Sequence, residues 1–213
     1  MVSRRNMLKT GLTAVFGACA VQTASASEVQ QKSQNNFDVV ILGAGTGGLV
    51  TAIEAADLGL KPVVLEKMEC SAGNSLYASG GIAAWGTSQQ KEEGRNETKE
   101  SFREDMMKVS EYRADPALVG AYVNHIPEDF EWLKKQGVKF SKIGKKPWPL
   151  NYRMHNVDGQ GLTGGARLVR YLLEACEKRN IPIIYNTKAI ELLTNDAGRV
   201  IGVRAQGDLH KTD

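Results

Sequence analysis

Apolar positions change their period along the first part of the chain. Residues 37–42 form an apolar run rich in β-branched side chains, which is typical of a strand buried on both faces. Residues 49–59 then show helical spacing, and Gly59 is well placed to end that helix. A second apolar strand at 62–65 stops at Glu66. This order predicts two parallel strands joined by a helix, the beginning of an α/β fold.

A glycine-rich turn connects the first strand to the helix. Gly43 allows a tight turn, Gly45 lets the backbone approach a pyrophosphate, and Gly48 permits close packing of helix on strand. The helix N-terminus favours the phosphate charge. Glu66, 23 residues after Gly43, can accept hydrogen bonds from the adenosine ribose, which disfavours NADP. The unit predicts a nucleotide-binding site but does not distinguish NAD from FAD as the cofactor. The candidate cofactor-binding residues in the turn are Gly43, Ala44, Gly45, Thr46, Gly47 and Gly48.

The segment after the second strand favours FAD. Glu66-Lys67 is followed by Asn74-Ser75, and a small-residue stretch then ends in Gly80-Gly81. Here the chain resembles the fumarate reductase and succinate dehydrogenase flavoprotein family, in the soluble branch that includes urocanate reductases and 3-ketosteroid dehydrogenases. The resemblance implies that these positions lie along the FAD ribityl chain and diphosphate, with Gly80 and Gly81 beside the isoalloxazine ring. Ala72 departs from the glycine that the family usually has before Gly-Asn.

The middle of the chain is helical in character. Residues 89–113 are charged, and Asp115-Pro116 has the form of an N-cap followed by the first helical residue. We expect a helix over 117–123 and a further helix over 129–136 that ends at Gly137. These segments match the helical region that follows the second flavin loop in the family.

Arg153-Met154-His155 and a glycine-rich stretch at 159–165 precede an amphipathic helix at 166–179. The family has a similar stretch that runs back toward the flavin. Two roles are open for His155, direct chemistry or hydrogen bonding within the flavin-loop scaffold, and we expect the second because this is not the family's substrate histidine.

Three strands are expected near the end, at 181–187, 189–193 and 199–205. The resemblance implies that the first strand extends the main sheet and that the last two form a hairpin. It also implies that the backbone of Ala189 contacts the adenine edge.

Charge separates the first 26 residues from the rest. They contain Arg4, Arg5 and Lys9 and no acid, and without these three charges 24 basic residues balance 24 acidic ones. A neutral body argues against a nucleic-acid-binding protein. The paired arginines before a weakly apolar stretch predict a twin-arginine export signal over 1–26, a linker over 27–36, and a periplasmic or cell-envelope location. Lipidation at Cys19 is the alternative to cleavage, and no stable membrane span is expected.

We therefore expect residues 37–213 to form the N-terminal part of a Rossmann-like FAD-binding domain, a parallel sheet with helices on both faces, without a capping domain. The resemblance implies an exported oxidoreductase acting on a C=C or CH–CH group of an unsaturated carboxylate or a steroid-like enone, with a cytochrome or a quinol-linked protein as electron donor. Because the family's catalytic residues fall beyond the matched region, we assign no catalytic residue and no metal ligand, and expect a truncated fragment. The alternatives are a 3-ketosteroid dehydrogenase and a non-catalytic nucleotide-binding module completed by a second polypeptide.

Overall fold

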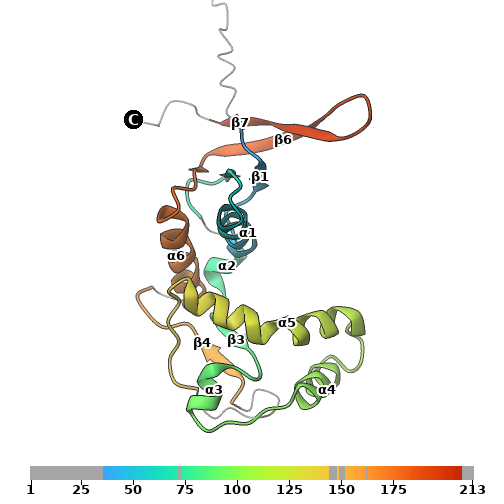
Figure 1. Ribbon diagram of the computed structural model, residues 1–213, viewed down its shortest axis with the longest axis vertical. Coiled ribbons are helices and arrows are strands. Elements are labelled where there is room, and N and C mark those ends of the chain that lie inside the picture. Colours follow the sequence, from blue (N-terminus) through green and yellow to red (C-terminus); the bar gives the residue numbers. More distant parts are fainter. Residues whose placement is uncertain (1–35, 72, 144–147, 149–151, 162, 208–213) are drawn as a thin grey trace, which may run out of the picture. The chain divides into compact units, whose positions relative to one another are not determined.

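The computed structural model describes residues 36–71, 73–143, 148, 152–161 and 163–207 (Figure 1). The expected export signal and all but the last residue of the linker lie outside these residues. In chain order the elements are β1 (Val39–Leu42), α1 (Thr46–Asp57), β2 (Pro62–Leu65), α2 (Asn74–Tyr77), β3 (Gly81–Ala83), α3 (Ser88–Glu92), α4 (Lys99–Val109), α5 (Pro116–Lys135), β4 (Met154–Asn156), α6 (Gly164–Glu177), β5 (Ile183–Ile184), β6 (Thr187–Thr194) and β7 (Val200–Gly207).

A parallel sheet with strand order β1-β2-β5 carries the nucleotide-binding unit. Val39 pairs with Pro62 and Val64 pairs with Ile183, so the expected strand–helix–strand unit and its extension by a later strand are confirmed. β5, the third strand of this sheet, is shorter than the strand expected at 181–187. Asn186 has a left-handed backbone with φ of 50° and leads the chain out of the sheet into β6, so only Ile183–Ile184 pairs.

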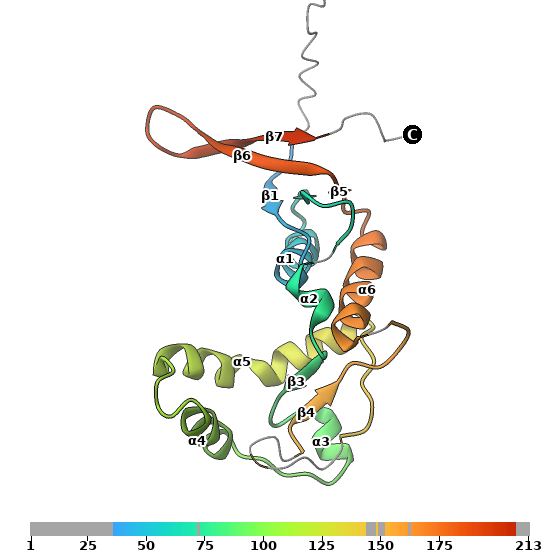
Figure 2. The same cartoon turned by 180° about the vertical axis from the view of Figure 1, so that it is seen from behind.

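The core of this unit joins two helices to the sheet. Leu49 and Ile53 of α1 and Leu172 of α6 are fully buried in one cluster with Ile41 and Val64. α1 and α6 therefore pack against each other, as both views show (Figures 1 and 2). The helix expected at 166–179 begins two residues earlier, where the Thr163 side chain accepts a hydrogen bond from the Ala166 N–H.

α5 is one continuous helix, so the expectation of two helices at 117–123 and 129–136 is wrong. Asp115 caps it and Pro116 is its first residue, as expected. Pro127 lies inside the helix and has no N–H, which leaves the carbonyl of Val123 without its intrahelical donor. The indole N–H of Trp85 donates to that carbonyl at 2.8 Å. This contact from outside the helix satisfies the freed carbonyl, so the helix passes through the proline.

Two antiparallel pairs of strands lie outside this sheet. β3 pairs with β4, with Gly81 opposite Asn156 and Ala83 opposite Met154. β6 and β7 form the expected hairpin, with Ala189 opposite Ala205. A second buried cluster, formed mainly by α4 and α5, packs beside β3 and contains Ala84, Phe102, Val119, Val123 and Ile126.

Candidate functional site

The glycine turn after β1 has the geometry that its sequence predicts. Gly43 has φ of 103°, a value that favours glycine, and its N–H donates to the carbonyl of Leu65 at 2.8 Å. A Cβ on Gly48 would lie 1.9 Å from the Gly43 carbonyl oxygen. Gly48 is therefore required for close packing of α1 on the turn, the role that the sequence predicts for it.

Gly45 differs, because the protein itself leaves room for a side chain there. The nearest heavy atom to a Cβ on Gly45 would be the Ser75 hydroxyl oxygen, at 3.8 Å. Gly45 is also the N-cap of α1; it has no side chain with which to cap the helix, and the first turn holds no acid. An open cradle at a helix N-terminus without a competing carboxylate fits a diphosphate.

Glu66 ends β2 and reaches back to the glycine turn. Its carboxylate accepts hydrogen bonds from the backbone N–H groups of Ala44 at 2.7 Å and Met68 at 2.9 Å, and the residue is buried. Each oxygen keeps a further lone pair for a ribose hydroxyl. The Glu66 carbonyl accepts from the N–H of Thr187, two residues before Ala189, so β6 begins beside this acid.

Ser75 brings the next segment to the same helix terminus. Its hydroxyl lies 3.0 Å from the Thr46 hydroxyl and accepts a longer bond, 3.4 Å, from the Thr46 N–H. Asn74 begins α2 and is exposed, and Lys67 is exposed as well. The structure therefore brings together the glycine turn, Glu66 and Ser75. The roles of Asn74, Lys67 and Ala189 toward FAD remain predictions.

Gly80 is required by backbone packing, and Gly81 lies against the flexible side chain of Met154. A Cβ on Gly80 would lie 2.1 Å from the backbone carbon of Gly164 at the start of α6, and one on Gly81 would lie 2.3 Å from the Met154 sulfur. The Gly165 N–H donates to the Ala78 carbonyl at 3.0 Å. The glycine pair is thus held between α6 and β4. Its expected position beside the isoalloxazine ring remains a prediction.

His155 is fully buried, and both of its ring nitrogens are engaged. Nδ1 lies 2.7 Å from the Arg153 carbonyl oxygen and therefore carries the proton, which leaves Nε2 to accept from the Thr87 hydroxyl at 2.9 Å. The Phe130 ring packs on the imidazole with a centroid distance of 4.5 Å. Burial lowers the pKa of His155, although the backbone carbonyls and nearby acids oppose this effect. A neutral, satisfied imidazole favours the scaffold role over direct chemistry.

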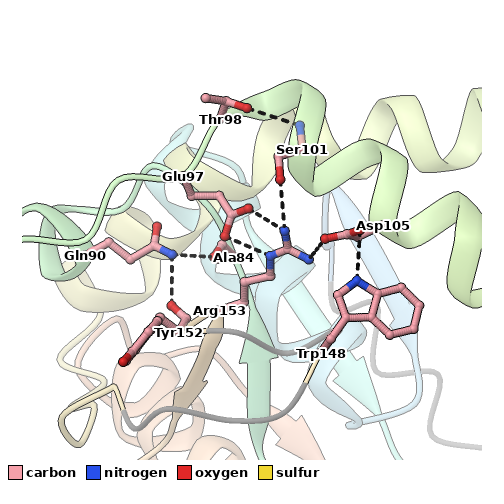
Figure 3. Close-up of polar contacts among 9 residues, drawn as sticks. All are labelled: Ala84, Gln90, Glu97, Thr98, Ser101, Asp105, Trp148, Tyr152 and Arg153. Carbon is pink, nitrogen blue, oxygen red and sulfur yellow. Dashed lines mark hydrogen bonds and ion pairs between the residues drawn. The ribbon is translucent and has the colours of Figure 1, made fainter.

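Arg153 forms a buried ion-pair network that the sequence did not predict (Figure 3). Its guanidinium binds both oxygens of Glu97, with Nε to Oε2 at 2.8 Å, and Nη1 lies 2.8 Å from an Asp105 oxygen. Nη2 also reaches the Ser101 hydroxyl at 3.4 Å. Hydrogen bonding to Glu97 raises the pKa of Arg153, and Asp105 adds to that effect. Burial tends to raise the pKa of Asp105, but hydrogen bonds from Trp148 and Arg153 lower it overall.

The partners of Arg153 are separated from it by about 50 residues, and no periodic pattern links them. The alternation of Arg153 and His155 about Met154, with both polar residues buried at the start of β4, gave the one local signal in the described residues. Within the described ranges no group of three or more metal-ligating side chains is found. None of the described helices is both long and apolar enough to span a bilayer.

Comparisons with known proteins agree with this geometry. Residues 38–212 match the model of a family described as "FAD binding domain". The chain is 35% identical over 173 residues to a fumarate reductase (cytochrome) of Shewanella frigidimarina, covering 81% of this chain and 30% of that protein. It is 27% identical to a urocanate reductase of Eggerthella lenta, covering 91% of this chain and 34% of that protein.

Two solved structures show the same fold. The open conformation of a flavocytochrome c3 fumarate reductase has a TM-score of 0.70 at 27% identity, over 80% of this chain and 30% of that one. A 3-ketosteroid-Δ4-(5α)-dehydrogenase from Rhodococcus jostii RHA1 has a TM-score of 0.72 at 26% identity, over 83% and 44%. The chain thus spans about 30% of the length of the fumarate reductases it matches. The family model matches most of the chain, and the glycine turn with Glu66 beside it agrees with that match. This protein therefore belongs to the FAD-binding domain family of the fumarate reductase flavoproteins, as their N-terminal portion.

Proposed function

We propose that this chain supplies the FAD-binding part of an oxidoreductase of the fumarate reductase type, which exchanges a hydride with a C=C or CH–CH group. The observation that carries the proposal is the cradle at α1. Gly45 leaves space where a diphosphate fits, this N-cap residue has no capping side chain, and the Glu66 carboxylate is fixed beside it. Bound FAD would supply the hydride acceptor and donor chemistry, since the side chains of proteins do not.

The residues of this chain would act by holding the cofactor. The N-terminus of α1 would bind the diphosphate, and Glu66 would accept from the ribose hydroxyls. Ser75 and Thr46 have their hydroxyls at the same helix end, where they can donate to phosphate oxygens. Because the chain matches about 30% of the length of its fumarate reductase relatives, we assign no residue in it to proton transfer or substrate binding. We propose that those groups belong to further polypeptide.

Two substrate classes follow from the relatives. The proteins named fumarate reductase and urocanate reductase favour an unsaturated carboxylate. The 3-ketosteroid dehydrogenase structure, with its TM-score of 0.72, supports a steroid-like enone as the second candidate. The name "fumarate reductase (cytochrome)" supports a cytochrome as electron partner, and a quinol-linked protein is the alternative.

A binding experiment with two glycine variants and two flavins tests the proposal. Gly45→Ala fills the cradle without touching protein atoms closely, so the chain should fold while its affinity for FAD falls by about 10- to 100-fold, or about 1.4–2.8 kcal/mol. Gly120→Ala on α5, where a Cβ also meets open space, is the matched control and should bind as the unmodified chain does. FMN, which lacks the ADP moiety, should bind far more weakly than FAD. Equal binding of FAD and FMN by the unmodified chain would refute the site.

We also propose that the protein is exported by the twin-arginine route, on the basis of Arg4 and Arg5. Replacing both with lysine in the full chain should retain the precursor in the cytoplasm, as measured by cell fractionation. Replacing Cys19 with serine tests the lipidation alternative, since only an acylated cysteine would lose labelling by a fatty-acid analogue. Unchanged export of the double-lysine variant would indicate the general secretory route.

A further inference from the structure

We infer that Arg153 and His155 are positioning residues, which hold the Gly80–Gly81 backbone in place for the flavin end of FAD. This inference rests on the function proposed above. The two residues flank Met154, with Arg153 directly before the strand β4 and His155 within it, and they anchor this strand to different parts of the protein. The side-chain partners described for the two residues, Glu97 and Asp105 for Arg153 and Thr87 for His155, do not belong to the glycine turn.

β4 determines where β3 lies. Gly81 is opposite Asn156 in the antiparallel register, and Met154 occupies the space where a side chain on residue 81 would project. Backbone hydrogen bonds close both ends of the pair. The Val157 N–H donates to the Gly80 carbonyl at 3.0 Å, and the Ala84 N–H donates to the Arg153 carbonyl at 3.0 Å. A shift of β4 would therefore move Gly80 and Gly81 with it.

The Arg153 side chain anchors β4 to the α4 region (Figure 3). The guanidinium is 5% exposed, and it binds Glu97 with two nitrogens and Asp105 with the third. The indole N–H of Trp148 donates to the other oxygen of Asp105 at 3.0 Å. Such a planar fork fixes both direction and distance, which a lysine at this position could not reproduce.

The His155 side chain anchors β4 to α3 and α5. The Thr87 hydroxyl that donates to Nε2 also accepts from the Gln90 N–H at 3.1 Å, as the N-cap of α3. Nδ1 binds the Arg153 carbonyl, the same oxygen that accepts from Ala84. Phe130 of α5 packs on the imidazole ring. The imidazole thus links the cap of one helix, the core of another and the strand junction itself.

The two ends of FAD should therefore respond differently to these anchors. The ADP end depends on the glycine turn and Glu66, whereas the flavin end depends on the segment that β4 holds. Loosening β4 should weaken FAD binding and alter the absorption spectrum of bound flavin, while ADP affinity stays the same. A general loss of stability would change both affinities alike.

Arg153→Lys in the full chain is the principal test, with Arg179→Lys as its matched control. Arg179 also makes a bidentate pair, to Asp57 at 2.7 and 2.9 Å, but it ties α6 to α1 away from β4. We expect Arg153→Lys to raise the FAD dissociation constant about tenfold with ADP affinity unchanged. Amide hydrogen exchange at residues 81–84 should accelerate about tenfold in Arg153→Lys and remain unchanged in Arg179→Lys.

Thr87→Val tests the second anchor, because it removes the hydroxyl that His155 binds. Asp115→Ala is its control: like Thr87→Val it removes the side chain that caps a helix, but the Asp115 side chain caps α5 and is not the one that binds His155. Faster exchange at residues 81–84 is expected only in Thr87→Val.

The inference is overturned if Arg153→Lys and its control give the same exchange and the same ratio of FAD to ADP affinity. If the unmodified chain binds neither ligand, the proposed function fails, and the exchange data alone then decide whether the two residues position this segment.

Discussion

Glu66 should stabilise the fold even when no cofactor is bound. Both oxygens of its buried carboxylate accept backbone N–H groups, one from Ala44 and one from Met68. Glu66→Gln keeps the shape of the side chain but offers one acceptor oxygen in place of two, so one N–H must face an amide NH₂ group. Ala44 is fully buried, and no water can replace the lost acceptor there.

A hydrogen bond to a charged group contributes about 1.5–3 kcal/mol, so Glu66→Gln should lower the free energy of unfolding by about 2 kcal/mol. In a domain of this size that corresponds to a fall in Tm of about 4–8 °C. The assay is urea and thermal unfolding of the FAD-free chain, followed by circular dichroism. Glu69→Gln is the matched control: Glu69 is exposed, and a surface change of this kind costs less than about 0.5 kcal/mol.

Stabilities of Glu66→Gln and Glu69→Gln that agree within about 0.5 kcal/mol would refute the reasoning, because they would show that the two backbone N–H groups gain nothing from the carboxylate. The expected result also affects how binding data are interpreted. A loss of FAD affinity in a Glu66 variant combines a lost ribose contact with a loosened glycine turn. Gly45→Ala, which leaves the turn intact, separates the two effects.

Three further predictions concern stability. Leu172→Ala should lower the free energy of unfolding in urea by about 3 kcal/mol, because Leu172 of α6 is fully buried against α1. Leu118 on α5 is 71% exposed, so Leu118→Ala should lower it by less than about 0.5 kcal/mol. Gly48→Ala should leave the chain largely unfolded by circular dichroism, because its Cβ would overlap the Gly43 carbonyl; a cooperative melt near that of the unmodified chain would contradict this. Burial holds the pKa of His155 below its usual value, so the unfolded chain binds the proton more readily. The stability from neutral His155 should be complete above about pH 6.5 and decline as the pH falls below it, and His155→Gln should flatten that decline.

Local patterns were sufficient to predict the nucleotide-binding unit. β2 is largely buried and β1 is partly buried, with Ile41 in the core and Leu42 exposed. The helix has an apolar face, and the glycines have backbone requirements that neighbouring residues impose. The same applies to α6 and to the β6–β7 hairpin, whose turn residues lie between two apolar runs. In each case the element carries its own local pattern, although α6 itself packs on the distant α1.

Elements that depend on distant contacts and lack a local pattern of their own were not predicted. β3 and β4 are three residues long, too short for an apolar alternation, and they exist because Ile82 meets His155 across 73 residues of chain. α5 continues through Pro127, between the two helices expected at 117–123 and 129–136, because the hydrogen bond that the proline cannot make is replaced from outside the helix by Trp85. Gly80 and Gly81 were attributed to the flavin, whereas the Gly164 backbone already excludes a side chain at residue 80.

The hydrogen bond from Trp85 to Val123 has an evolutionary consequence. The Val123 carbonyl is available to the indole only because Pro127 supplies no N–H, and Pro127 is tolerated in α5 because the indole takes that carbonyl. Each residue thus removes the penalty that the other would carry alone. We expect the pair to covary among homologues, so that lineages which lose the tryptophan also replace the proline. Their substitutions should show positive epistasis, with the double variant less impaired than the sum of the single variants.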